Sequence, residues 1–238
     1  MWLRHFRLIR ITGITTITLA VIYLAYISLY RPTPFVPPVI PSEVSVPPLL
    51  SDPVYDNSVP EIPTVKKEAG FVSPLDRGNE RVTKKPFGIL IHKATSPIQP
   101  ERFSGYHTGA DFEIFPEESD IDVTVSAVCT GSLLSKRSVS GYGGVVIQSC
   151  EHDGKPVTII YGHLRLAGIK MQKGATLSAG KAIGMLGTGY SVETDGERKH
   201  LHLGIHKGAT PDIRGYVSDA NDLSGWIDPL SRIFGSFH

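Results

Sequence analysis

The sequence contains little cysteine and little net charge. It has two cysteines in 238 residues, which excludes a dense disulfide framework and a zinc site made of four thiolates. The formal net charge is +1, so the chain has no strongly basic field, and nucleic acid is not an expected partner. A His-Glu-x-x-His motif is absent, as are repeats at the periods of solenoids or propellers. The length leaves room for one good-sized domain with additional segments.

Charged residues are also missing from residues 11–30. As a helix this stretch is about 30 Å long, which matches the core of a bilayer. Arg4, Arg7 and Arg10 precede it, a bias that keeps the amino terminus in the cytoplasm. A cleaved signal peptide is the alternative, but no small-x-small cleavage site follows the stretch. We predict a cytoplasmic N-terminus over 1–10 and a transmembrane signal-anchor helix over 11–30. Both interpretations place the rest of the chain on the periplasmic or cell-wall side of the membrane.

Residues 31–86 have few features of a folded domain. Ten of the 18 prolines lie between positions 32 and 63, where few residues support a helix or a sheet ladder. At about 3.1 Å per residue, a polyproline-like stalk over residues 32–63 spans up to roughly 100 Å. We predict a Pro-rich extracytoplasmic linker over 31–86, either as a stalk of defined length or as a spacer without a length requirement.

From residue 87 the pattern changes to short apolar runs separated by glycine-containing turns, which is typical of an all-β domain. No segment has helical periodicity for more than about two turns. We predict one all-β domain over 87–238, a length that is sufficient for a single core. The expected strands are 88–91, 111–115, 123–128, 131–135, 144–148, 157–162, 182–186 and 201–206.

The two cysteines lie near the ends of two of these expected strands. Cys129 and Cys150 flank 136–143, a segment that carries turn residues. If the two runs form a hairpin, the cysteines lie near one another across it. In an exported domain the pair can form a disulfide; two buried free thiols are the alternative.

Residues 199–206 alternate polar and apolar side chains, as expected for a strand. His200 and His202 then share one face and start about 6.6 Å apart, close enough to serve one small site. His206 lies about 13 Å beyond His202, too far to join the same site. The pair is either a coincidence in a chain with nine histidines or part of a metal site, because neutral imidazole is a common metal ligand.

A second group of metal-binding residue types lies just before an alternating strand. His107 and Asp111 stand four residues apart, and His202 would complete a set of two nitrogens and one oxygen. Zinc accepts such a set and keeps a fourth position for water. A zinc hydrolase also uses a positioned base and a hydrogen-bond donor for the developing oxyanion. His163, at the end of a predicted strand, and His200 are the candidates for these two tasks.

Three segments together resemble the motifs of the lysostaphin-type zinc metalloendopeptidases, in the same order. They are GYHTGADF at 105–112, YGHL at 161–164 and HLH at 200–202. The resemblance covers roughly residues 105–205. It implies an antiparallel β-sheet core with a substrate groove, and hydrolysis of peptide cross-bridges or stem peptides in peptidoglycan. By motif position it implies that His107, Asp111 and His202 bind Zn²⁺. It also implies that His163 and His200 polarise water or stabilise the tetrahedral intermediate, in roles that stay unassigned between them.

The sequence departs from the family pattern in two places. Residues 190–199 form a longer turn than is usual before the His-x-His strand, and Leu203 and Gly204 follow where many relatives have an aromatic residue and a glutamate. Loops beside a groove commonly determine substrate choice, so specificity is not carried over. We expect a membrane-anchored zinc metalloendopeptidase acting on peptidoglycan peptides. The alternatives are a non-catalytic relative that binds cell wall or activates a partner hydrolase, and a metallopeptidase with another peptide substrate.

Overall fold

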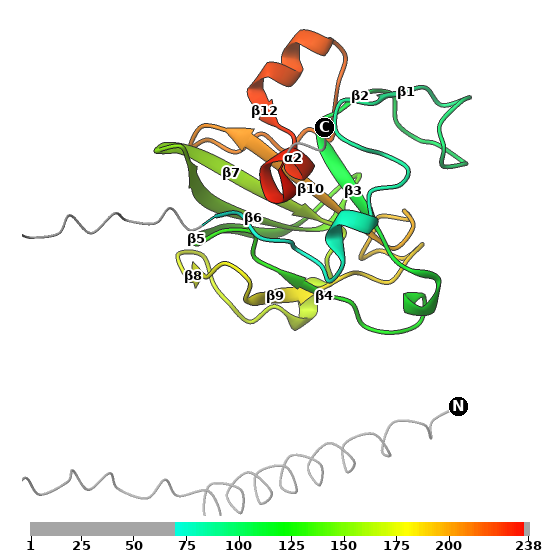
Figure 1. Cartoon of the computed structure of the whole chain (residues 1–238). Coiled ribbons are helices and arrows are strands. Elements are labelled where there is room, and N and C mark those ends of the chain that lie inside the picture. Colours follow the sequence, from blue (N-terminus) through cyan, green and yellow to red (C-terminus); the bar gives the residue numbers. More distant parts are fainter. Residues whose placement is uncertain (1–69, 236–238) are drawn as a thin grey trace, which may run out of the picture. The chain divides into compact units, whose positions relative to one another are not determined.

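The computed structural model describes residues 70–235, which form a predominantly antiparallel β fold with few helical turns (Figure 1). Every strand pairing in this part is antiparallel. The prediction of an all-β domain is therefore confirmed. The predicted transmembrane helix at 11–30 lies outside the described residues. Between residues 70 and 235, no helix has the length and apolar character needed to cross a membrane.

The strands of the described residues are β1 (Leu90–Ile91), β2 (Gly105–His107), β3 (Gly109–Glu113), β4 (Thr124–Ser126), β5 (Gly131–Val139), β6 (Gly143–His152), β7 (Lys155–Gly162), β8 (Thr176–Leu177), β9 (Ala182–Met185), β10 (His200–Lys207), β11 (Tyr216–Val217) and β12 (Trp226–Ile227). Of these strands, β5, β6, β7 and β10 have eight to ten residues each, and the others have two to five. One α-helix, α2 (Pro229–Phe234), follows them, and 3₁₀ turns lie at Gly78–Glu80, Pro116–Glu118, Leu166–Gly168 and Ala220–Gly225.

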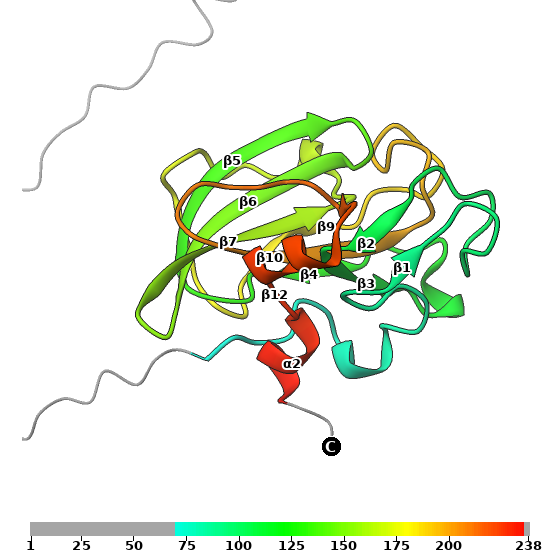
Figure 2. The same ribbon diagram turned by 90° about the horizontal axis from the view of Figure 1, so that it is seen from above.

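The main sheet has the order β12-β10-β7-β6-β5-β8, and β3 also pairs with β10. β3 and β12 follow one another along one edge of β10, whereas β7 occupies its other edge. Viewed from above, β5, β6, β7 and β10 run side by side (Figure 2). Strand β10 thus lies inside the sheet, and its first six residues are buried.

The two faces of β10 have different surroundings. Leu201, Leu203 and Ile205 are fully buried in the larger hydrophobic core, as their alternation predicts. A smaller apolar cluster, which includes Tyr142 and Trp226, packs against Ile213 from the segment between β10 and β11. The histidine face is therefore covered by protein and is not an exposed polar surface.

Most of the predicted strands are present, with different ends. The central hairpin is longer than expected: β5 continues to Val139, and β6 begins at Gly143, its cross-strand partner. Residues 136–139, expected to belong to the turn, are strand residues. The strands that the sequence pattern did not predict are β2, β8, β11 and β12, with two or three residues each. Segments this short contain no measurable alternation.

The predicted start of the domain at residue 87 is too late. Phe71 and Leu75 are buried in the main core, and the side chains of Arg81 and Lys85 are only 1% and 2% exposed. Their charges, which made this segment resemble a linker, are paired with carboxylates further along the chain. The last part of the predicted linker therefore belongs to the folded domain.

The two cysteines are joined. Cys129 precedes β5 and Cys150 lies in β6, with their Cα atoms 6.3 Å apart in a disulfide. Of the two alternatives that the sequence left open, the structure has the disulfide.

Candidate metal centre

Strand register brings the histidines of β10 to both neighbouring strands. His202 lies directly opposite Asp111 of β3 on one side and Gly162 of β7 on the other. His163 follows Gly162 at the end of β7. His107 comes from β2, which belongs to the separate β1-β2-β11 sheet. The five predicted residues, far apart in the sequence, therefore converge on the start of β10.

Three donor atoms form a compact triangle. His107 Nε2 lies 3.1 Å from His202 Nδ1 and 3.3 Å from Asp111 Oδ1, and His202 Nδ1 lies 3.2 Å from the same oxygen. A tetrahedral zinc ion with ligands at about 2.0–2.1 Å separates its donor atoms by about 3.3–3.4 Å. The two nitrogens and one oxygen therefore fit a zinc ion in both chemistry and spacing. All three residues are buried.

Hydrogen bonds orient both imidazoles of the triangle. His107 Nδ1 lies 3.2 Å from the Pro86 carbonyl oxygen and donates to it, which leaves the lone pair of Nε2 facing the triangle. His202 Nε2 lies 3.3 Å from the Tyr142 hydroxyl, and in the tautomer with a lone pair on Nδ1 the Nε2–H group donates to that oxygen. Partners of this kind fix the ring and the tautomer of metal-binding histidines.

Ionisation in the site also suits a metal. Burial raises the pKa of Asp111, but the neighbouring His200 and His107 outweigh it and hold that pKa well below its usual range. Burial lowers the pKa of His202 to about 4, with partial opposition from Asp111. At neutral pH the carboxyl is ionised and the imidazole is neutral, which are the forms that bind metal.

Glycine makes room for the His202 ring. A Cβ atom at Gly109 would lie 2.5 Å from the Leu203 carbonyl oxygen and 2.8 Å from the His202 imidazole. A Cβ atom at Gly162 would lie 2.5 Å from the ring of Tyr142. Both glycines are therefore required for the close packing of the strands around His202.

The two remaining predicted histidines lie beside the triangle. The ring centroids of His163 and His200 are 4.2 Å apart. His200 Nδ1 donates to the Arg198 carbonyl oxygen at 2.8 Å, while its Nε2 lies 3.3 Å from Asp111 Oδ2. His163 has a left-handed backbone (φ 64°) and a buried Nδ1 without a protein hydrogen-bond partner. Burial lowers its pKa well below the usual value, as does the neighbouring His200, so the ring is neutral.

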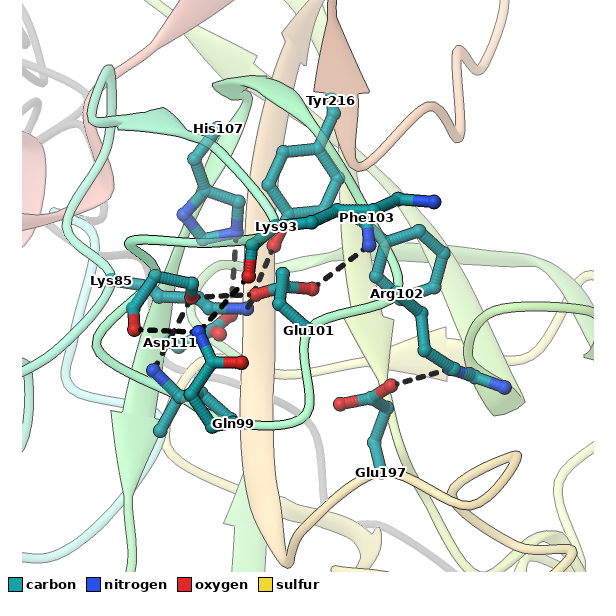
Figure 3. A network of polar contacts seen from close by, with 12 residues as sticks. Lys85, Lys93, Gln99, Glu101, Arg102, Phe103, His107, Asp111, Glu197 and Tyr216 are labelled. Atoms are coloured by element: carbon teal, nitrogen blue, oxygen red, sulfur yellow. Dashed lines mark hydrogen bonds and ion pairs between the residues drawn. The ribbon is translucent and has the colours of Figure 1, made fainter.

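A cavity of about 380 Å³ opens onto these residues, a volume within the range of small-molecule and peptide-side-chain sites. Asp111, His163, His200 and His202 line it together with Tyr142. On another side, Lys85 lies between Glu101 and Tyr216, with its Nζ 2.5 Å from Glu101 Oε2 and 3.2 Å from the Tyr216 hydroxyl (Figure 3).

The structure also places the residues that the sequence excluded or missed. His206 packs against Trp226, with ring centroids 4.9 Å apart, and is not part of the donor triangle. Tyr142 and Arg198 contact the predicted ligands but were given no role from the sequence. Arg198 precedes His200 by two residues, so the same alternation that pairs His200 with His202 could have identified it.

Residues 105–212 match the family model of Peptidase family M23. No curated protein sequence matches the chain significantly. Among solved structures, Csd3 of Helicobacter pylori is 19% identical over 71% of this chain, with a TM-score of 0.43. This chain covers 36% of the length of that structure.

Two further structures have similar values. LytU is 21% identical, over 63% of this chain and 81% of its own length, with a TM-score of 0.42. A zinc containing peptidase from Vibrio cholerae is 20% identical, over 62% of this chain and 41% of its own, with a TM-score of 0.39. The family match covers every candidate ligand and both further histidines, so residues 105–212 correspond to Peptidase family M23.

Proposed function

We propose that this chain is a membrane-anchored zinc metalloendopeptidase that hydrolyses peptide bonds in the cross-bridges or stem peptides of peptidoglycan. The observation that carries the proposal is the donor triangle of His107, Asp111 and His202, which lies beside two further imidazoles in one cavity. The match of residues 105–212 to Peptidase family M23 supports the reaction type.

His107, Asp111 and His202 would hold the zinc ion through Nε2, Oδ1 and Nδ1. A zinc ion in such a site is a Lewis acid that makes water a good nucleophile near neutral pH. The chain's own contribution is to keep these atoms in place and to exclude bulk water. The buried ligands and their hydrogen bonds to Pro86 and Tyr142 meet both requirements.

His163 and His200 would handle the proton and the developing charge at the scissile carbonyl. His200 uses Nδ1 to bind the Arg198 carbonyl, so its Nε2 is the atom available for chemistry. The His163 ring is neutral, and its buried Nδ1 has no protein partner. Each ring suits either task, which is to accept a proton from attacking water or to donate a hydrogen bond to the oxyanion.

Two features support the proposed location of the domain. The Cys129–Cys150 disulfide is typical of proteins in oxidising compartments outside the cytoplasm. Residues 11–30, which we predict to be a signal anchor, would hold the domain at the membrane on the periplasmic or cell-wall side. Peptidoglycan peptides are the substrate class available there.

The test is digestion of purified peptidoglycan and of defined muropeptides by the full chain, with the products identified by mass spectrometry. We expect new peptide termini that disappear with a metal chelator and in His202→Ala. His206→Ala is the matched control, because this histidine lies in the same strand but contacts Trp226, and it should retain activity. Full activity of both the chelated protein and His202→Ala would contradict the proposal. Zinc binding without cleavage of any fragment would instead favour a non-catalytic wall-binding or activator role.

A further inference from the structure

We propose that Arg198 is a positioning residue for the metal site and fixes which oxygen of Asp111 faces the two ligand histidines. This inference rests on the proposed function, because it concerns the same site. It also gives the long turn before β10 a role besides the substrate choice that loops beside a groove commonly determine.

The two oxygens of Asp111 have different partners. Oδ1 belongs to the donor triangle. Oδ2 accepts a hydrogen bond from Arg198 Nη2 at 3.0 Å and lies 3.3 Å from His200 Nε2. A carboxylate can rotate about its last bond, and a donor fixed on one oxygen determines where the other points. Arg198 is in place to hold Oδ1 toward His107 and His202.

Arg198 is itself held by a second carboxylate. Its Nε donates to the two carboxylate oxygens of Glu113, at 2.9 and 3.1 Å, and Nη2 also contacts Glu113. Glu113 lies two residues after Asp111 in β3, opposite His200 of β10. The guanidinium is a rigid, planar fork, so binding Glu113 through Nε and Nη2 directs the second N–H of Nη2 at Asp111.

Charge gives the same residue a second task. The side chains of Asp111, Glu113 and Arg198 are 3%, 10% and 9% exposed. Without Arg198, two carboxylates on one face of β3 would lie buried next to each other and lose the cation that pairs with both of them. One arginine therefore orients the ligand and keeps this part of the sheet electrostatically balanced.

The preceding turn fixes the position of Arg198 by contacts at several points. The Asp195 carboxylate accepts from the Gly141 N–H at 2.8 Å, at the tip of the β5–β6 hairpin. Arg102 Nε donates to Glu197 at 2.9 Å (Figure 3). Thr194 is fully buried, and its hydroxyl donates to the Glu197 carbonyl oxygen at 2.7 Å. These contacts make the turn an ordered support that ends in Arg198.

The experiment measures zinc affinity of the full chain by competition with a chromophoric chelator, alongside thermal unfolding of the metal-free protein. In Arg198→Lys the charge remains but the fork is lost. We expect zinc affinity to fall about 10–100-fold, as is typical for loss of an outer-shell partner, with a much smaller effect on unfolding. A purely structural role would change unfolding and leave zinc affinity unchanged.

Glu113→Gln provides a second variant in case Arg198→Lys does not fold. It keeps Arg198 but weakens the ion pair with residue 113 that holds the guanidinium in place. Zinc affinity should therefore also fall, by a smaller factor. Because Glu113 acts through Arg198, combining both substitutions should weaken affinity no further than Arg198→Lys alone. The matched control is Arg165→Lys. Arg165 pairs with Asp122 at 2.9 Å and with Glu193 of the same turn at 3.5 Å, and these partners are not members of the donor triangle.

The outcomes separate this inference from the function on which it rests. Wild-type zinc affinity in both Arg198→Lys and Glu113→Gln would overturn the positioning role and leave the metal centre intact. An equal loss in Arg165→Lys would also overturn it, since the effect would then belong to the turn as a whole. A wild-type chain that binds no zinc would overturn the proposed function, and this inference with it.

Discussion

Space around His202 is set by a residue without a side chain. A methyl group at position 109 would meet the Leu203 carbonyl oxygen at 2.5 Å and the His202 ring at 2.8 Å. The Leu203 backbone and the packed His202 ring have little freedom to move away from an added methyl group. At the scale of single residues, the site therefore depends as much on Gly109 as on its ligands.

We predict that Gly109→Ala destabilises the fold by about 1–3 kcal/mol, as overpacking of a core does, and lowers the zinc content. Gly168→Ala is the control, because a Cβ atom at that position meets nothing within 4 Å. Urea denaturation and metal analysis of both proteins provide the comparison. Equal stability and equal zinc content in the two variants would show that the strands can move apart at no cost.

A buried ion pair supports the segment that carries Pro86. The side chains of Lys85 and Glu101 are 2% and 1% exposed, with Nζ 2.5 Å from Oε2. We predict that Lys85→Met lowers the free energy of unfolding by about 3–5 kcal/mol, since it leaves a buried carboxylate unpaired. Arg77→Ala breaks an exposed pair with Glu80 and should have little effect. Similar denaturation midpoints for the two variants would contradict this account of Lys85.

The same pair predicts a loss of stability in acid. Burial raises the pKa of Glu101, but hydrogen bonds from Lys85, the Phe103 N–H and Ser96 outweigh it and hold that pKa below the usual 4.5. The contribution of Glu101 is therefore present above about pH 4.5 and is lost as the pH falls through the lower, folded-state pKa. Denaturation of wild type and Glu101→Gln from about pH 6 to about pH 3, a range that brackets the usual carboxyl pKa, measures this contribution of Glu101. The variant should lose less stability over that interval, and parallel curves would refute the assignment.

At the scale of elements, the disulfide ties the start of β5 to β6. Cys129 and Cys150 are 21 residues apart, and a cross-link of this length limits the unfolded chain by about 3 kcal/mol in the chain-entropy description. We predict a loss of that order in the Cys129→Ala, Cys150→Ala double variant, measured by urea denaturation without reductant. Adding reductant to wild type should reproduce the loss, and no difference between the oxidised and reduced proteins would contradict it.

Strand β10 shows why part of the site was predictable. Its alternation is local, so the sequence alone places His200 and His202 on one face and excludes His206. The short strand β2 carries His107 but is too short to have a periodicity of its own. His107 was identifiable from the motif GYHTGADF at 105–112 and not from a strand pattern. Arg198 and Asp111 are 87 residues apart in the sequence, and no local pattern specifies such a pair.

At the scale of the whole molecule, the domain begins earlier than its composition indicates. Phe71 and Leu75 belong to the main core, and Pro86 accepts from a candidate ligand. The charged residues in between resemble a linker in the sequence because their partners, such as Glu118 and Glu101, lie further along the chain. The last part of the predicted linker, from Phe71 to Pro86, therefore supports the candidate metal centre.

The central claim is that this chain holds one zinc ion on His107, Asp111 and His202. Metal analysis of the purified full chain, equilibrated with zinc and freed of unbound metal, tests it most directly, with His202→Ala prepared in parallel. The donor triangle predicts about one zinc per wild-type chain, following the three-ligand chemistry of catalytic zinc, and a marked loss in the variant. A wild-type chain without zinc, or a variant that retains as much as wild type, would contradict it.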